Sequence, residues 1–420
     1  FAVVMFWQNM RMREVFSDNR KKISGINAQL QDSLAGMRVV KSFANEETER
    51  FKFRASNNRY LSSKENMYHA MGVYTATYGL LSGVLYVIVV LLGGWLVAQG
   101  QLQAVDMATF ALYISLFCTP LETLVNSAET YQKAIAGFKR MDEVLSTAPD
   151  IQDKPDALPL KNVQGEVTFE NVSFHYEESK ENVLSNVNLH VPAGDYVALV
   201  GSSGAGKTTL CSLIPRFYDV TEGRILLDGK DIRDVKLKDL RDEIGFVPQK
   251  GVLFSGTIAS NLRFGKDDAT DAEIEKAAAI AQATEFIEAK DDKYETAIAQ
   301  GGTNVSGGQK QRLAIARAIA KDPKIFIFDD SFSALDLKTD AALRKALAEN
   351  VKDSTVIIVA QRISTILHAE QILVLDDGKV VGKGTHEELL RSCEVYQEIA
   401  KSQLSEKELG LKESEVADHE

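Results

Sequence analysis

The chain has few cysteines, little tryptophan and no concentrated basic segment. Its three cysteines, Cys118, Cys211 and Cys393, lie far apart without the spacing of a metal site, which fits a reducing compartment. The formal net charge is −11 and no basic stripe occurs, so a nucleic-acid partner is not expected. The 45% hydrophobic and 25% charged content over 420 residues predicts two or three folded domains.

Charged residues are absent from one long stretch. No Asp, Glu, Lys or Arg occurs between Asn66 and Val105, and residues 72–98 within it are apolar. A helix that crosses a bilayer needs about 20 such residues, whereas a helix in a soluble core is rarely that long. The stretch therefore predicts a membrane span, and Gly100-Gln101 after it predicts a turn.

A second, weaker span is predicted over residues 104–128. Pro120 should bend this helix, and Glu122 interrupts its apolar run. Because a charge inside a membrane is costly, Glu122 faces a transport cavity or a partner helix, or else lies near the membrane surface; both alternatives stay open. The helical pattern continues to Leu145, beyond the bilayer.

The chain begins with the apolar run Phe1–Trp7 and no initiator Met, so we expect it to be a fragment. Basic residues follow this run rather than precede it, which argues against a signal peptide and indicates an exit on the cytoplasmic side. Residues 11–67 carry apolar side chains at helical spacing on both sides of Gly36. They predict two long cytoplasmic helices joined by a short turn.

The composition changes after residue 146. Three prolines mark a linker over residues 147–165. From 166 to 401, short strand-like runs alternate with helical ones, which predicts an α/β domain with a largely parallel sheet. Residues 402–420 form a charged tail for which we expect disorder.

A phosphate-binding loop follows the strand-like run Val197–Val200. The pattern Gly-x-x-x-x-Gly-Lys-[Ser/Thr] stands between a strand and a helix, as this loop requires. Its glycines let backbone N–H groups close around phosphates, Lys207 reaches the β- and γ-phosphates, and Thr208 coordinates Mg²⁺. The residues expected to bind the nucleotide here are Gly201, Ser202, Ser203, Gly204, Ala205, Gly206, Lys207, Thr208 and Thr209.

A carboxylate and a second glycine-rich turn accompany this loop. The apolar strand Ile325–Asp329 ends in an acid, which places Asp329 beside the phosphate loop, where it can hold the water shell of Mg²⁺. The turn that starts at Ser306 opens a helix and is chemically a second anion-binding N-terminus. One phosphate loop already satisfies one nucleotide, so the second anion site indicates that two chains share each ATP.

The turn at Ser306 matches the signature sequence of the ATP-binding-cassette (ABC) family, which the chain resembles over nearly its whole length. The resemblance implies an α-helical membrane domain over residues 1–146, followed by an α/β P-loop NTPase domain of the ABC type. It implies that the two spans are the fifth and sixth of an exporter and that residues 39–47 form a cytoplasmic coupling helix. The first three spans and most of the fourth would then be absent, and ATP and Mg²⁺ would be the cofactors.

The resemblance also assigns roles to single residues. Tyr176 corresponds to the aromatic residue that stacks on adenine, with a plain sheet aromatic as the alternative. Gln249 corresponds to the Q-loop glutamine that touches Mg²⁺ or its water and senses the membrane domain. The signature residues, which act on the ATP of a partner chain, are Ser306, Gly307, Gly308 and Gln309, and those of the D-loop between the two ATPase domains are Ser333 and Asp336.

Two positions depart from the family pattern of an active cassette. Where the family has a catalytic Glu, the chain has Asp330, whose carboxylate is retracted by about 1.5 Å. A misplacement of this order can cost roughly 100-fold in rate. Where the family has His, the chain has Gln361, which cannot carry a proton or a positive charge. With an intact signature, these changes are typical of the degenerate member of a heterodimeric exporter; a homodimer that uses Asp330 as a slower base is the alternative.

The sequence therefore predicts the ATPase subunit of an exporter that moves a hydrophobic or amphipathic compound, such as a drug, lipid or peptide. We expect it in the cytoplasmic membrane with its ATPase domain in the cytosol. A regulatory subunit that binds ATP with little hydrolysis is an alternative of a different class. The attached span excludes a soluble ATPase of DNA repair or translation, and the fusion of both domains favours export over import.

Overall fold

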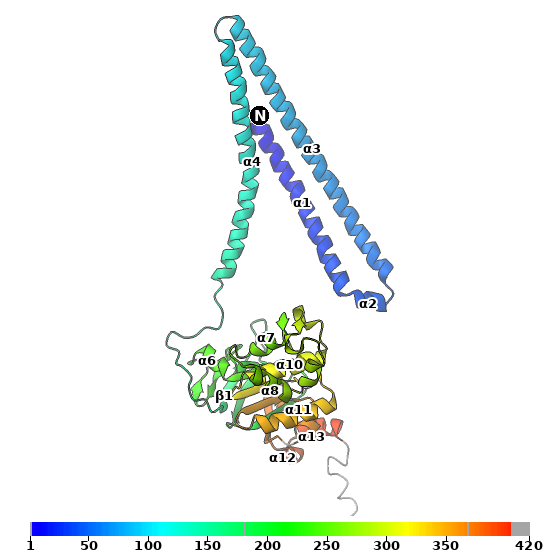
Figure 1. The fold of residues 1–420 in the computed structure, drawn as a ribbon, viewed down its shortest axis with the longest axis vertical. Helices are drawn as coiled ribbons and strands as arrows, with labels where there is room; N and C mark the ends of the chain where they lie inside the picture. Colours follow the sequence, from blue (N-terminus) through cyan, green and yellow to red (C-terminus); the bar gives the residue numbers. More distant parts are fainter. Residues whose placement is uncertain (1, 180, 368, 405–420) are drawn as a thin grey trace, which may run out of the picture. The chain divides into compact units, whose positions relative to one another are not determined.

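The structure, a computed structural model, describes residues 2–179, 181–367 and 369–404. The chain forms two compact units, Phe1–Ala148 and Pro149–Glu420, which are taken separately below. The first unit is entirely helical in its described residues, and the second contains all the described strands (Figure 1).

The first unit consists of four helices, α1 (Ala2–Ala35), α2 (Met37–Ser42), α3 (Glu46–Ala98) and α4 (Ala104–Ser146). The expected pair of cytoplasmic helices lies in α1 and α3. In both cases the cytoplasmic and apolar parts form one uninterrupted helix. α4 continues through Pro120.

The short helix of the expected coupling segment begins and ends earlier than residues 39–47. It is α2, residues 37–42, and Glu46 and Glu47 already belong to the first turn of α3. Acidic side chains are favoured there, because the N-terminus of a helix carries a partial positive charge. The segment therefore joins α1 and α3 as one turn of helix with a short loop on its C-terminal side.

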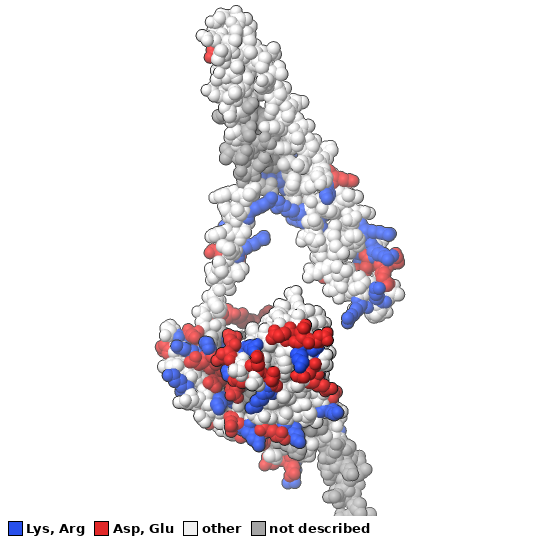
Figure 2. All heavy atoms as spheres, viewed as in Figure 1, with Lys and Arg blue, Asp and Glu red and all other residues white. Residues whose placement is uncertain are grey.

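α3 is long and apolar enough to cross a membrane, by its length and composition. Figure 2 shows that the far part of the α3–α4 hairpin carries almost no charged side chains, whereas the ends of α1 and α3 near α2 carry many. The described apolar part of α4 is Ala104–Ile114, which is shorter than a bilayer crossing. The second span over 104–128 stays a prediction, and the side chains of Cys118 and Glu122 lie outside the described residues.

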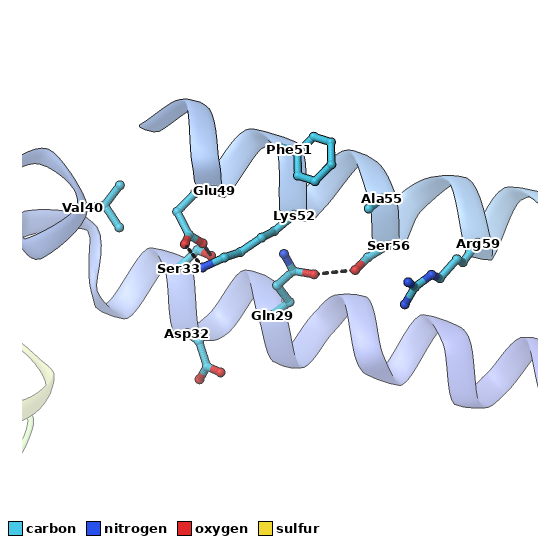
Figure 3. A pocket seen from close by; sticks show the side chains of 10 residues that line it. All are labelled: Gln29, Asp32, Ser33, Val40, Glu49, Phe51, Lys52, Ala55, Ser56 and Arg59. Atoms are coloured by element: carbon cyan, nitrogen blue, oxygen red, sulfur yellow. Dashed lines mark hydrogen bonds and ion pairs between the residues drawn. The ribbon is translucent and has the colours of Figure 1, made fainter. Parts of the chain in front are cut away.

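α1 and α3 lie side by side and are joined by polar contacts near α2 (Figure 3). Ser33 Oγ donates to Glu49 Oε2 at 2.6 Å, and Ser56 Oγ donates to Gln29 Oε1 at 2.6 Å. These pairs connect residues from two different helices, so they fix the register of α1 against α3 close to the coupling segment.

The second unit is an α/β domain built from many short elements. Its strands are β1 (Val167–Phe174), β2 (Leu184–Val191), β3 (Tyr196–Gly201), β4 (Glu222–Leu227), β5 (Lys230–Asp231), β6 (Ile244–Val247), β7 (Gly256–Thr257), β8 (Ala297–Ile298), β9 (Ile325–Asp329), β10 (Thr355–Val359), β11 (Gln371–Asp376) and β12 (Lys379–Gly384). Its helices are α5 (Lys207–Leu213), α6 (Leu237–Asp242), α7 (Ile258–Arg263), α8 (Asp271–Ile280), α9 (Thr284–Glu288), α10 (Gly307–Ala320), α11 (Leu337–Asn350), α12 (His386–Ser392) and α13 (Glu394–Gln403), with 3-10 turns η1 (Lys293–Glu295), η2 (Gln300–Gly302) and η3 (Ile363–Thr365).

The main sheet has the strand order β12-β11-β3-β10-β9-β6, in which all strands except β12 run parallel. β9 and β10 are buried along their whole length, because hydrophobic side chains cover both faces of the sheet. A second sheet of order β2-β1-β4-β5 is antiparallel. The alternation of strands and helices predicted the parallel sheet but gave no sign of the antiparallel one.

Both ends of the second unit differ from the expected boundaries. Leu160 and Val163, expected in the linker, are buried against the ATPase-type domain. At the other end, α13 continues to Gln403 and Leu404 is buried, so residues 402–404 belong to the domain and not to the tail. The rest of the tail, residues 405–420, lies outside the described residues.

Asp228 fastens the start of this domain to the turn between β4 and β5. Its carboxylate accepts the backbone N–H groups of Gln164 at 2.8 Å, Gly165 at 3.1 Å and Glu166 at 2.9 Å. Asp228 has a positive φ of 49°, a conformation that Asp and Asn tolerate better than other residues with a β-carbon.

We expect Asp228→Ala to lower the free energy of unfolding by about 1–2 kcal/mol, because three N–H groups lose their acceptor. The midpoint of thermal unfolding of the purified chain and hydrogen exchange at residues 164–166 measure this change. Asp228→Asn is the matched control, since it keeps one acceptor oxygen and tolerates the positive φ. Equal stability and exchange in Asp228→Ala and the natural chain would contradict the role of this carboxylate.

Candidate nucleotide-binding site

Four adjacent parallel strands end at one edge of the main sheet, and each leads into a candidate site residue. β3 leads into the phosphate loop, β10 into Gln361, β9 into Asp329 and Asp330, and β6 into Gln249. The carboxyl ends of parallel strands meet at the same edge. The topology therefore brings together residues that are far apart in the sequence.

The phosphate loop needs glycine at two positions. A β-carbon on Gly201 would lie 2.1 Å from the carbonyl oxygen of Leu375, and one on Gly206 would lie 2.7 Å from Leu184 Cδ2. Both residues also have a positive φ, of 151° and 95°. The loop can therefore keep this tight path between neighbouring strands only with glycine there.

The side chain of Lys207 folds back onto the phosphate loop and bonds to its backbone. Its Nζ donates to the carbonyl oxygens of Gly201 at 2.9 Å and Ser202 at 2.6 Å. Burial lowers the pKa of Lys207, and the nearby carboxylates of Asp330 and Asp329 oppose that shift. A bound phosphate would offer this cation a far better partner than two neutral carbonyl groups. The lysine and the loop thus fit an anionic phosphate chain.

Thr208 and Asp329 form the oxygen pair expected for Mg²⁺. Thr208 Oγ1 donates to Asp329 Oδ1 at 2.8 Å. Burial raises the pKa of Asp329, while the bond from Thr208 lowers it. Oxygen atoms are the ligands that Mg²⁺ prefers, and it usually completes its shell with phosphate oxygens and water. Thr208 and Asp329 supply two such oxygen atoms, so they fit an ion whose other ligands come from a nucleotide and water.

The Asp330 carboxylate accepts hydrogen bonds from both candidate glutamines. Its Oδ2 accepts from Gln249 Nε2 at 2.8 Å and from Gln361 Nε2 at 2.6 Å. Asp330 is only 7% exposed and has a positive φ of 49°. The amide groups of Gln249 and Gln361 are therefore the two hydrogen-bond donors of one carboxylate oxygen.

Tyr176 lies next to the phosphate loop. Its ring packs edge-on against Phe174 and Tyr218, with centroid separations of 4.9 and 5.3 Å, and its Oη is 3.0 Å from Thr209 Oγ1. Ser202 Oγ donates to Asp376 Oδ1 at 3.4 Å, while Ser203 and Gly204 are exposed and Ala205 is buried. A role of Tyr176 toward adenine stays a prediction.

The expected signature residues lie at the start of α10. Ser306 caps this helix: Gln309 N–H donates to Ser306 Oγ at 3.2 Å, and Ser306 N–H donates to Gln309 Oε1 at 3.0 Å. A β-carbon on Gly307 would meet no atom within 4 Å, and one on Gly308 would lie 3.4 Å from Ala334 O. None of the hydrogen bonds in the described residues joins this turn to the phosphate loop of the same chain.

The expected D-loop residues both bond within their own segment. Ser333 Oγ donates to the carbonyl oxygen of Asp330 at 2.9 Å. Asp336 caps α11 by accepting from Thr339 N–H at 2.9 Å and Thr339 Oγ1 at 2.8 Å, and these bonds lower its pKa. The segment expected to be the D-loop is therefore bonded through Ser333 to the backbone of Asp330 and ends at Asp336, which caps α11.

Sequence reasoning missed two residues that support the site. Gln311, one turn into α10, donates to Pro248 O at 3.1 Å and accepts from Gly251 N–H at 2.8 Å, so it holds the loop that carries Gln249. Asp376 ends β11 beside β3, and a carboxylate at the end of an apolar strand was the one available signal for it. No pattern in the sequence singles out Gln311.

Both units of the chain match models of known protein families. The family described as ABC transporter transmembrane region matches residues 1–121, and the ABC transporter family matches residues 184–333. A putative multidrug export ATP-binding/permease protein of Bacillus subtilis (strain 168) is 40% identical over 380 residues, which are 90% of this chain and 66% of the relative. An ATP-dependent lipid A-core flippase of Syntrophus aciditrophicus (strain SB) is 35% identical over 410 residues, 98% of this chain and 68% of the relative.

The fold is also similar to a solved structure of a bacterial Atm1-family ABC exporter with ATP bound. The TM-score is 0.83 at 32% sequence identity, and the match covers 96% of this chain and 71% of that chain. The chain spans about two thirds of the length of the curated relatives named above. It belongs to the ABC transporter family, as an exporter half-transporter that fuses a membrane-spanning region to a cytosolic ATP-binding domain of the P-loop type.

Proposed function

We propose that this chain binds Mg·ATP and drives export together with a second half-transporter that carries the stronger catalytic site. The observation that carries the proposal is the state of Asp330, whose Oδ2 is shared by the amide groups of Gln249 and Gln361. A general base must reach the proton that it removes. An oxygen with two amide donors, on a side chain one methylene shorter than Glu, is a poor candidate for that step.

The nucleotide would be held by residues that follow the carboxyl ends of the parallel strands. The phosphate loop and Lys207 would bind the phosphates, and Thr208, Asp329 and Gln249 would hold Mg²⁺ or its water. When bound, the metal supplies positive charge that offsets the charge developing on the phosphate oxygens. Lys207 and the loop N–H groups contribute binding and orientation of the same phosphates.

Gln361 contributes less to turnover than the family's His would. Its amide can donate a hydrogen bond to a phosphate, but it has no ionisable proton and no positive charge. Together with Asp330, it supports a site that binds ATP and hydrolyses it slowly. A homodimer in which Asp330 serves as a slower base would contain two such sites.

The signature turn supports a role toward a partner chain. Ser306 and Gln309 bond to each other, Gly307 stays open to approach, and α10 continues for 14 residues behind them. A helix N-terminus with this opening suits the γ-phosphate of a nucleotide bound elsewhere. We therefore assign the intact half of the stronger composite site to this chain.

The cargo we propose is a hydrophobic or amphipathic compound. One relative is named for multidrug export and another for flipping lipid A-core, and both classes of compound partition into membranes. A drug, a lipid or an apolar peptide fits this class.

Lys207→Ala should abolish binding of Mg·ATP to this chain's site, because it removes the cation that faces the phosphates. Fluorescent-nucleotide titration of the purified chain measures the affinity. Lys230→Ala, at an exposed lysine of β5, is the matched control and should bind as the natural chain does. Unchanged affinity in Lys207→Ala would overturn the assignment of the phosphate loop.

We assign Ser306 to the stronger site and Asp330 to the weaker one, so substitutions of these two residues should have unequal effects on the assembled transporter. Ser306→Arg should lower ATP hydrolysis by about 100-fold, because a bulky cation blocks closure over the stronger site. Asp330→Asn should lower it by about twofold or less, because its own site contributes little turnover. Ser392→Arg, on an exposed residue of α12, controls for the added arginine. If Asp330→Asn proves the more damaging, this chain is a working catalytic subunit with Asp as its base.

Restoring the family's residues should strengthen the weak site. We expect Asp330→Glu with Gln361→His to raise total hydrolysis, since the carboxylate regains its reach and the imidazole can carry charge. Each single substitution should give less than the pair, because the two side chains bond to each other. If the double variant hydrolyses ATP no faster than the natural chain, Asp330 and Gln361 do not limit the rate at this site. The partner's signature turn would then be the limiting part.

A further inference from the structure

The last turn of α13 reaches the loop that carries Gln361. Ile363 N–H donates to Gln403 Oε1 at 2.8 Å, and Gln403 Nε2 donates to Gln361 O at 2.8 Å. One side chain therefore bonds to the backbone on both sides of Arg362. Glutamine suits this position because its amide offers a donor and an acceptor at the same time.

Packing holds Gln403 in place. Tyr396 and Ala400 on α13 and the following Leu404 are buried in the core of the domain, as is Ile363 at the start of η3. The N–H of Ile363 stands at the start of a helical turn, where a backbone donor has no partner within the turn. Gln403 supplies that partner from a helix 40 residues further along the chain.

The bonded loop determines where Gln361 points. Its backbone carbonyl is held by Gln403, and its side-chain amide donates to Asp330 Oδ2 at 2.6 Å. We propose that Gln403 is a positioning residue that fixes the loop so that Gln361 faces Asp330 and the terminal phosphate of bound ATP. In this proposal α13 supports the nucleotide site without touching the nucleotide. This inference rests on the proposed role of Gln361.

The proposal predicts an effect that depends on the γ-phosphate. Because the proposed partner of Gln361 is the terminal phosphate, loss of its position should weaken ATP binding and leave ADP binding unchanged. One hydrogen bond corresponds to about a two- to tenfold change in affinity. A general loss of structure would weaken the binding of both nucleotides.

The first measurement tests the contact itself. In the full chain in lipid nanodiscs, Gln403→Ala should speed hydrogen exchange of the Ile363 amide by about tenfold and speed trypsin cleavage after Arg362. Ser402→Ala, the neighbouring exposed residue of α13, should change neither. Gln403→Glu keeps an acceptor for Ile363 N–H and should keep its exchange slow.

The second measurement tests whether Gln403 acts through Gln361. The ratio of ATP to ADP affinity is measured for Gln403→Ala, Gln361→Ala and the double variant, with fluorescent analogues of both nucleotides. Each single variant should lower the ratio, and Gln403→Ala should add nothing in the Gln361→Ala background.

The possible failures differ from one another. Unchanged exchange of Ile363 in Gln403→Ala overturns the contact. The positioning role is overturned if exchange is faster but the ratio of ATP to ADP affinity stays unchanged. It is also overturned if the two substitutions lower that ratio additively in the double variant. In both cases the contact itself stands. An unchanged ratio in Gln361→Ala alone shows that the proposed role of Gln361 has failed, and the inference falls with it.

Discussion

The parallel register of β3, β10, β9 and β6 is the constraint on which the nucleotide site depends. Each of these strands is held by backbone hydrogen bonds to its neighbours, and each ends at the same edge. Because both faces of the sheet are buried, a shift of one strand would move its whole set of core side chains. The positions of Lys207, Asp329, Gln361 and Gln249 are therefore set by the core of the domain.

Four glutamines connect this rigid edge to more distant elements. Gln249 and Gln361 meet at Asp330, Gln311 holds the loop of Gln249, and Gln403 holds the loop of Gln361. An amide side chain carries no charge to desolvate, so it can join partly buried loops at modest cost and with both a donor and an acceptor. The result is a polar network that reaches from α10 to α13 through the carboxylate of Asp330.

The sequence predicted the parts of this arrangement that depend on local pattern. The phosphate loop, the apolar strand ending at Asp329 and the long charge-free helix were each predictable from a short segment, because spacing or composition alone carries the signal. The antiparallel sheet, Gln311 and Gln403 were not, because each depends on contacts between segments far apart in the chain. The end of the last described helix was also missed, because Leu404, which follows α13, is buried by contacts with distant segments.

The two halves of the nucleotide site respond to change in different ways. On the phosphate side, glycines with no room for a β-carbon and a lysine inside the loop leave little freedom for substitution. On the opposite side, Asp330 and Gln361 stand where the family has Glu and His, and Asp330 Oδ2 accepts from the amides of both Gln361 and Gln249. This arrangement, one carboxylate with two amide donors, is the observation on which our proposal of a slowly hydrolysing site rests. The same backbone leads from Asp330 through Ser333 into the expected D-loop, and a β-carbon on Gly308 would lie 3.4 Å from Ala334 O. In our proposal, the segment that follows Asp330 therefore packs beside the turn that we assign to the partner's nucleotide.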